Sequence, residues 1–139
     1  MKDYTLIDHT ADIGIHVAGK NLQDIFIKAA AAMFDVIAQP VKRLKATDKK
    51  QIAIELKADS YDELLLEWLS ELLSLSDAKR LIFTDFKILK LTKTSLKAKV
   101  YSSARRNFSI EREIKAVTYH HLKIEQKRGQ YHAEIIFDV

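Results

Sequence analysis

Carboxylates stand at both ends of this chain, far apart in sequence but next to similar apolar segments. The segment 8–12 holds two aspartates, and Asp138 is followed by the last residue, Val139. Apolar residues alternate over 13–17 and 131–137, a pattern that predicts two strands. If these strands pair side by side, the carboxylates converge on one spot. Oxygen ligands of this kind are the ones that hard divalent cations take.

The segment 8–12 has two interpretations at this stage. Asp8, His9 and Asp12 could bind a metal ion or take part in catalysis, since acids and imidazoles supply both kinds of site. Alternatively, the two aspartates order a turn by accepting hydrogen bonds from backbone amides. The residues alone leave both interpretations open.

Lys115 is the second candidate for chemistry. If the segment 113–121 is extended from its start, alternation places Lys115 on the same strand face as Val117. A lysine there either extends past the sheet edge into water or meets a carboxylate. Next to Asp12 or Asp138, its ammonium group would be suited to orienting a phosphate or an acidic ligand. The pattern does not decide between the two placements.

The composition excludes several other kinds of chemistry. The 139 residues include no cysteine, so a disulfide framework, a thiolate zinc site and a cysteine nucleophile are ruled out. With three glycines in the chain, a glycine-rich phosphate loop is not expected. No apolar run approaches the ~18 residues of a membrane span, and no secretory signal pattern begins the sequence. We therefore expect a cytoplasmic protein without a membrane partner.

The chain carries a formal net charge of +4, and its basic residues occur in short clusters. A basic rim is compatible with a nucleic-acid partner, because such binding depends largely on neutralising phosphates. Basic side chains at loop tips are also an ordinary way to keep a surface in water, so the charge pattern leaves RNA contact open. The clusters, most of them in predicted loops, are Lys42-Arg43-Leu44-Lys45, Lys49-Lys50, Lys79-Arg80, Arg105-Arg106 and Lys127-Arg128.

Two helices are predicted, each with its own start signal. Asn21 begins the first helix, with Asp24 three residues later in the manner of a capping box. Ser60 and Glu63 form the capping box of the second helix. Trp68 lies on the apolar stripe of that helix, and we predict that it packs in the core.

Strands account for most of the remaining chain. Together with 13–17, they predict the α+β class: a single domain over residues 1–139, with two helices packed on one face of a mixed, largely antiparallel sheet of about six to seven strands. A hairpin turn is predicted at Arg128-Gly129. The further predicted strands are 51–57, 81–91, 95–103, 112–126 and 130–137.

Several of these segments together resemble the archease family. The matching pieces occur in the family's order over the full length of the chain, and although any one would be weak, the set is specific. They are residues 9–14 (His-Thr-Ala-Asp-Ile-Gly), Gly19 with Leu22 and Phe26, residues 64–73 (Leu-Leu-Leu-Glu-Trp-Leu-Ser-Glu-Leu-Leu), residues 113–120 (Glu-Ile-Lys-Ala-Val-Thr-Tyr-His) and residues 137–139 (Phe-Asp-Val).

The resemblance implies an accessory protein rather than an enzyme. Archeases assist the RNA ligase that seals tRNA exon halves by joining 3′-phosphate or 2′,3′-cyclic phosphate ends to 5′-hydroxyl ends. They promote guanylylation of the ligase's active-site histidine and support its repeated turnover. The implied partner is therefore the tRNA-splicing RNA ligase, with tRNA reached through the ligase complex.

The resemblance also implies a divalent metal site. Its ligands would be Asp12, Asp138 and Val139, the last through its main-chain carbonyl or terminal carboxylate. The metal would be calcium, magnesium or manganese, all of which accept oxygen ligands. Lys115 falls on the family's functional lysine, and Asp24 lies where family members have an acid in the first helix.

One departure from the family pattern and two rival functions accompany this interpretation. The segment 102–108, which contains Arg105 and Arg106, lacks the glycine–glutamate pair and the histidine that often precede the lysine strand. The rival functions are a small basic RNA-binding protein and a metal-dependent phosphodiesterase. The chain offers no nucleophile with an evident activating base, which weighs against catalysis by this protein alone.

Overall fold

The chain folds into two α-helices and nine strands within the residues that the computed structural model describes, which are 3–8, 12–43, 45 and 48–139. The helices are α1 (Leu22–Ile37) and α2 (Tyr61–Lys79), and the 3-10 helix η2 spans Arg105–Asn107. The strands are β1 (Tyr4–Asp8), β2 (Asp12–Gly19), β3 (Ala38–Pro40), β4 (Lys49–Lys57), β5 (Leu81–Leu91), β6 (Ser95–Ala104), β7 (Phe108–Ile110), β8 (Ala116–Lys127) and β9 (Gln130–Asp138).

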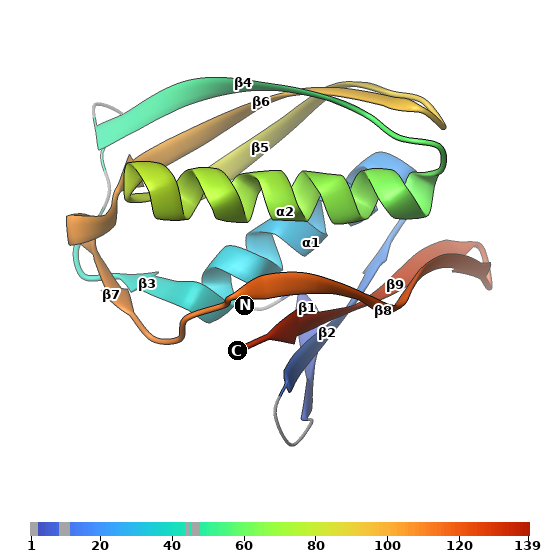
Figure 1. Ribbon diagram of the computed structural model, residues 1–139, viewed down its shortest axis with the longest axis horizontal. Coiled ribbons are helices and arrows are strands. Elements are labelled where there is room, and N and C mark those ends of the chain that lie inside the picture. Colours follow the sequence, from blue (N-terminus) through green and yellow to red (C-terminus); the bar gives the residue numbers. More distant parts are fainter. Residues whose placement is uncertain (1–2, 9–11, 44, 46–47) are drawn as a thin grey trace.

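The strands pair into three sheets, and every pairing is antiparallel (Figure 1). The four-stranded sheet has the order β1-β2-β9-β8, the three-stranded sheet has the order β4-β6-β5, and β3 pairs with β7. In the four-stranded sheet, the neighbouring strands β2 and β9 come from opposite ends of the sequence. This topology brings the two acidic segments of the chain together.

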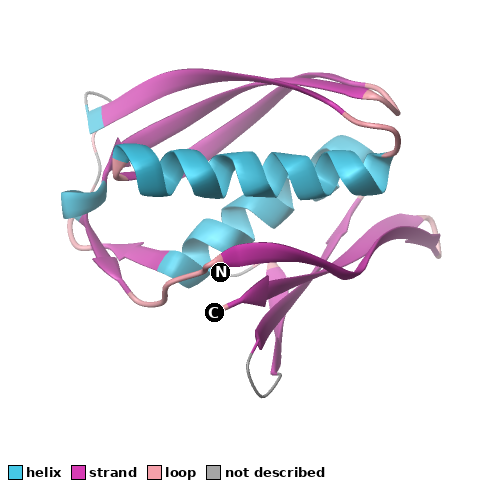
Figure 2. Ribbon diagram, viewed as in Figure 1, coloured by secondary structure: helices cyan, strands magenta, loops and turns pink. Residues whose placement is uncertain are grey.

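Both helices lie between the four-stranded and the three-stranded sheet (Figure 2). Helix α1 contacts β2 on one side and β5 on the other, while α2 contacts β8 as well as β4 and β5. The predicted α+β class with two helices is confirmed. The arrangement differs from the predicted single sheet of about six to seven strands with both helices on one face. Strand pairing joins residues distant in sequence, and apolar alternation within one segment does not reveal it.

Both helices begin at the predicted capping residues. Asn21 Oδ1 accepts a hydrogen bond from the Asp24 amide at 2.8 Å, and Ser60 Oγ accepts one from the Glu63 amide at 3.1 Å. Each bond satisfies an amide that the helix leaves without an internal partner. Trp68 is fully buried, and its indole N–H donates to a carbonyl of α1 at 2.9 Å, which confirms it as a core residue. Neither helix among the described residues is long and apolar enough to cross a membrane.

The hairpin between β8 and β9 turns where the sequence predicts. Arg128 (φ 52°) and Gly129 (φ 77°) both have positive φ, as a type I′ turn requires. Between Thr118 and Lys123, in the middle of β8, the register against β9 shifts, and His121 in this irregular stretch also has a positive φ of 59°. At the start of β8, Ala116–Thr118 pair regularly with the last residues of β9.

Candidate metal centre at the end of the four-stranded sheet

Three strands of the four-stranded sheet place Asp12, Asp138 and Ala116 in one row. The pairing of β2 with β9 sets Asp12 opposite Asp138, and the pairing of β9 with β8 sets Ala116 opposite Asp138. Residues directly opposite on antiparallel strands have Cβ atoms about 4.5–5.5 Å apart and project from the same face. The predicted convergence of the two terminal acids is therefore confirmed.

The acidic row faces away from the core. The next row of the same strands consists of Ile13, Phe137 and Val117, and all three are buried. Side chains of neighbouring residues on a strand point to opposite faces, so the row of Asp12 and Asp138 faces solvent. In agreement, Asp138 is exposed and Asp12 is partly exposed.

The two carboxylates have no partner for their charge within the described part of the chain. No ion pair or side-chain hydrogen bond there involves Asp12 or Asp138. Like charges directly opposite each other on neighbouring strands are destabilising. A bound cation would remove this repulsion, which makes the row a candidate cation site.

Lys115 lies at the edge of this row. Its backbone N–H donates to the Asp138 carbonyl at 2.8 Å, and its side chain is exposed and pairs with no acid among the described residues. The predicted shared face with Val117 is wrong, because β8 begins only at Ala116. Ile114 and Val117 are both buried, whereas the side chain of Lys115, just before the start of β8, is exposed to water.

The donor set fits a hard divalent cation. Asp12 and Asp138 offer carboxylate oxygens, and Val139 follows with main-chain oxygen. Calcium, magnesium and manganese all take such ligands, and magnesium is often held by one or two carboxylates with water completing its shell. No group of three or more histidine, aspartate or glutamate side chains that could hold a metal occurs among the described residues. Within the described part of the chain, further ligands would therefore be main-chain oxygen or water.

Asp24 lies at the other end of β2. Its Oδ2 accepts a hydrogen bond from the Lys20 amide at 3.1 Å and pairs with Lys28 Nζ at 3.5 Å. Asp24 also packs so closely against Gly19, the last residue of β2, that a Cβ on this glycine would lie 2.9 Å from the Asp24 side chain. The eight-residue strand separates Gly19 from Asp12 by about 23 Å.

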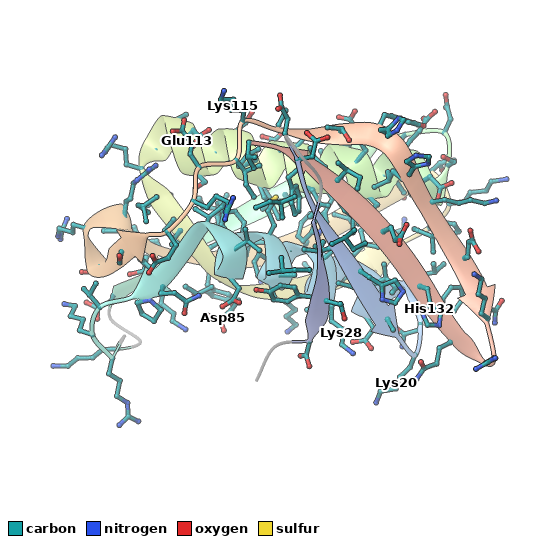
Figure 3. The ribbon with its side chains drawn as sticks, turned by 90° about the horizontal axis from the view of Figure 1, so that it is seen from below. Lys20, Lys28, Asp85, Glu113, Lys115 and His132 are labelled. Carbon is teal, nitrogen blue, oxygen red and sulfur yellow. The ribbon has the colours of Figure 1, made fainter. Side chains whose placement is uncertain are left out.

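The structure therefore does not bring Asp24 to the acidic row. Figure 3 shows Lys20 and Lys28, which both contact Asp24, on the opposite side of the molecule from Lys115.

Asp8 ends β1, and its backbone pairs with Ile13. The prediction for His9 falls outside the described residues.

Sequence reasoning missed a histidine pair on the outer face of the same sheet. His16 Nε2 and His132 Nδ1 are 3.2 Å apart, and the two rings stack with centroids 5.2 Å apart. The register sets His16 opposite Glu134 and His132 opposite Ala18, so the histidines are diagonal neighbours. The proximity of His16 and His132 can be inferred only from the register of β2 against β9. Once Asp12 is aligned with Asp138, this register places the two histidines next to each other.

The fold and the acidic row together define a class of protein. The chain is a small α+β protein in which two helices lie between antiparallel sheets and two acids face each other at the end of one sheet. The Archease protein family (MTH1598/TM1083) matches residues 4–139. The chain belongs to the archease family.

Curated relatives match over nearly the whole chain. The "Protein archease" of Pyrococcus abyssi is 36% identical over 147 residues, and the alignment covers 100% of both proteins. The "Protein archease" of Pyrococcus furiosus is 37% identical over 148 residues, again with 100% of both covered. Identity at this level over the full length agrees with the family assignment.

Two solved structures share the fold. The solution structure of Methanobacterium thermoautotrophicum protein 1598 superposes with a TM-score of 0.77, at 29% identity and with 100% of both chains covered. The Thermotoga maritima structure, described as an archease and possible chaperone, superposes with a TM-score of 0.67 at 21% identity. It covers 96% of this chain and 94% of its own. The second likeness concerns the fold alone.

Proposed function

We propose that this protein activates the RNA ligase of tRNA splicing, which joins 3′-phosphate or 2′,3′-cyclic phosphate ends to 5′-hydroxyl ends. In this proposal it promotes guanylylation of the ligase's active-site histidine and is not itself an enzyme. Membership of the archease family supports the proposal. The structural observation that carries it is the pair Asp12 and Asp138, opposite in register and facing solvent next to Lys115.

The acidic row is where the protein would hold a divalent cation. Asp12 and Asp138 would bind calcium, magnesium or manganese through carboxylate oxygens, and Val139 would add main-chain oxygen. When bound, such a cation neutralises negative charge on phosphoryl oxygens. Because Asp138 is exposed and Asp12 is partly exposed, a second protein can reach their carboxylates from the solvent.

Lys115 has a separate task in this proposal. Its amide is fixed by the hydrogen bond to the Asp138 carbonyl, so the main chain holds the base of the side chain next to the acidic row. The ammonium group is a compact charge on a flexible stem, which suits it to attracting a phosphate. We expect it to orient the triphosphate of GTP in the nucleotide pocket of the ligase.

The test is a guanylylation assay with the cognate ligase, GTP and manganese, with and without this protein. Asp12→Ala and Asp138→Ala should each reduce the stimulation on the order of 100-fold, because each removes one carboxylate from the cation site. Asp77→Ala is the matched control, since Asp77 is an exposed acid on α2 without an ion pair among the described residues.

The control variant should stimulate the ligase as well as the parent protein does. The proposal fails if the two terminal variants, folded as judged by circular dichroism, stimulate guanylylation as strongly as the parent. Equal loss in all three variants would also contradict it, because charge alone rather than the acidic row would then matter.

A further inference from the structure

One surface hollow of about 520 Å³ is lined by charged side chains of a single sign. We call it the basic hollow. Other hollows of this protein mix their charges: the one beside the histidine pair has Lys123 and Lys127 together with Glu125 and Glu134. The residues of the basic hollow that matter here are Lys79, Arg80, Arg105 and Arg106, with Leu81 and Ile110 as apolar neighbours.

The fold brings these cations together from two distant segments. Helix α2 ends at Lys79, and Arg80 turns the chain into β5 with a left-handed conformation (φ 54°). The Arg80 carbonyl accepts a hydrogen bond from the Arg105 amide at 3.0 Å, which fixes η2 against the end of α2. Figure 2 shows the C-terminal end of α2 and the 3-10 helix η2 at the same side of the molecule.

The four cations of the basic hollow are not neutralised by the protein itself. None of them forms an ion pair among the described residues, whereas Lys28, Lys49, Lys97 and Lys127 each pair with an acid. The negative end of the α2 dipole stabilises a charge at its last turn, and this accounts for Lys79. It gives no reason for two further arginines on η2.

Arg80 occupies a backbone position that favours another residue type. Residues at a helix end with left-handed conformation are usually glycine or asparagine, because other side chains adopt it at a cost in free energy. An exposed arginine at this position therefore supplies a cation where backbone geometry alone favours glycine. The local structure accepts a less suitable residue and gains a charge in the basic hollow.

We infer that the basic hollow binds phosphate groups of an RNA backbone. Guanidinium groups match phosphate oxygens with paired hydrogen bonds, which favours a phosphate ligand over scattered carboxylates. Ile110 is 36% exposed and offers an apolar surface to a ribose or base. This assignment goes beyond the proposed function, because it gives this protein direct contact with RNA.

The basic hollow and the acidic row are joined by one stretch of chain. Lys115 follows Arg106 by nine residues, so the two lie at most about 30 Å apart. A single RNA strand can therefore contact the hollow while its end is presented near Lys115. The geometry is consistent with an activator that holds the RNA substrate of its partner enzyme.

The experiment measures binding of a fluorescent single-stranded RNA to this protein alone, by anisotropy, over a series of salt concentrations. The hollow variant combines Arg80→Gln, Arg105→Gln and Arg106→Gln. It should bind about tenfold more weakly at low salt, and its plot of log affinity against log salt should be shallower by about 2, for three lost phosphate contacts.

The matched control combines Lys87→Gln, Lys90→Gln and Lys93→Gln, which removes the same charge from exposed lysines without ion pairs in the described part of the chain. The control should keep the parent's affinity and slope. The inference is overturned if both variants lose equal affinity, if neither loses any, or if polyglutamate displaces the RNA at equal charge concentration.

The same variants separate this inference from the proposed function. In a guanylylation assay without RNA, the hollow variant should stimulate the ligase as the parent does. Failure of Asp12→Ala and Asp138→Ala to affect guanylylation would contradict the proposed function and leave the RNA result untouched. Loss of RNA binding in those two variants, with the hollow variant unaffected, would overturn the basic hollow as the RNA site.

Discussion

Two groups of acids in this protein differ in one respect, which is whether the chain supplies their partners. Asp24 accepts from the Lys20 amide and pairs with Lys28, and Asp35 accepts from the Tyr4 hydroxyl at 2.5 Å. Asp12 and Asp138 face each other with no such partner among the described residues. Acids with internal partners stabilise the fold, whereas opposed acids that lack partners are available to an external cation.

The largest expected effect comes from removing both charges of the acidic row. In the variant Asp12→Asn with Asp138→Asn, affinity for manganese should fall at least about 100-fold, because both carboxylate ligands are replaced. The free energy of unfolding without metal should stay within about 0.5 kcal/mol or rise slightly, since repulsion between opposed charges is removed. Isothermal titration and urea unfolding measure the two quantities. A large loss of metal-free stability would place these acids with the partnered group.

The second effect concerns Tyr4 and Asp35. Burial, together with the hydrogen bond to Asp35 and its negative charge, raises the pKa of Tyr4 well above its usual value. Tyr4→Phe should lower the free energy of unfolding at neutral pH by about 2 kcal/mol, because a bond to a charged acceptor is lost. Urea unfolding of parent and variant gives this difference.

The hydrogen bond between Tyr4 and Asp35 also predicts how the free energy of unfolding changes with pH. Because the folded state holds the Tyr4 proton more tightly than the unfolded state, this contribution is complete below a pH of about 10 and is lost as the pH rises toward the folded pKa. The stability difference between parent and Tyr4→Phe should therefore shrink above pH ~10. A difference that stays constant there would contradict the interaction with Asp35.

A smaller loss is expected at the start of α1. Asp24→Ala removes the acceptor for the Lys20 amide and a negative charge from the positive end of the helix, so stability should fall by about 1 kcal/mol. Metal affinity and ligase stimulation should not change, because Asp24 lies at the far end of β2. A loss of metal affinity at unchanged stability would instead make Asp24 part of the metal site.

The smallest effect tests the ion pair of Asp24. Lys28→Met should lower the free energy of unfolding by about 0.5 kcal/mol, because a partly exposed ion pair four residues apart on a helix contributes little. Most of this loss should disappear at high salt, where the ion pair is screened. Thermal unfolding at two salt concentrations is sufficient. A salt-independent loss would show that the bond from Lys28 Nζ to the Ala18 carbonyl, at 3.1 Å, matters more than the charge.

The sequence predicted features that depend on local chemistry. Asn21 and Ser60 cap their helices because short polar side chains satisfy amides within the next turn. Trp68 is buried because it continues the apolar stripe of α2. The convergence of Asp12 and Asp138 was predicted on the condition that the two terminal strands pair, and the register of β2 against β9 meets this condition.

Features that depend on distant pairing were not predicted. Strand β1 and the division of the sheets follow from which strands meet, and this is not written in any one segment. The shared face of Lys115 and Val117 was predicted wrongly because β8 begins at Ala116, four residues after the predicted start of the strand at residue 112, so the alternation assumed before Ala116 does not apply. The contact between Arg80 and Arg105 likewise joins residues on different elements.

The most direct test of the central claim is to titrate isotope-labelled protein with manganese and follow its amide NMR signals. Manganese is paramagnetic and broadens the signals of nuclei close to where it binds. If the opposed acids form the cation site, the amides of Asp12, Asp138 and Lys115 should broaden first, while those of Asp24 and Asp35 remain sharp. Broadening that begins at Asp24 and Asp35, or none at concentrations where the ligase responds to this protein, would contradict the account.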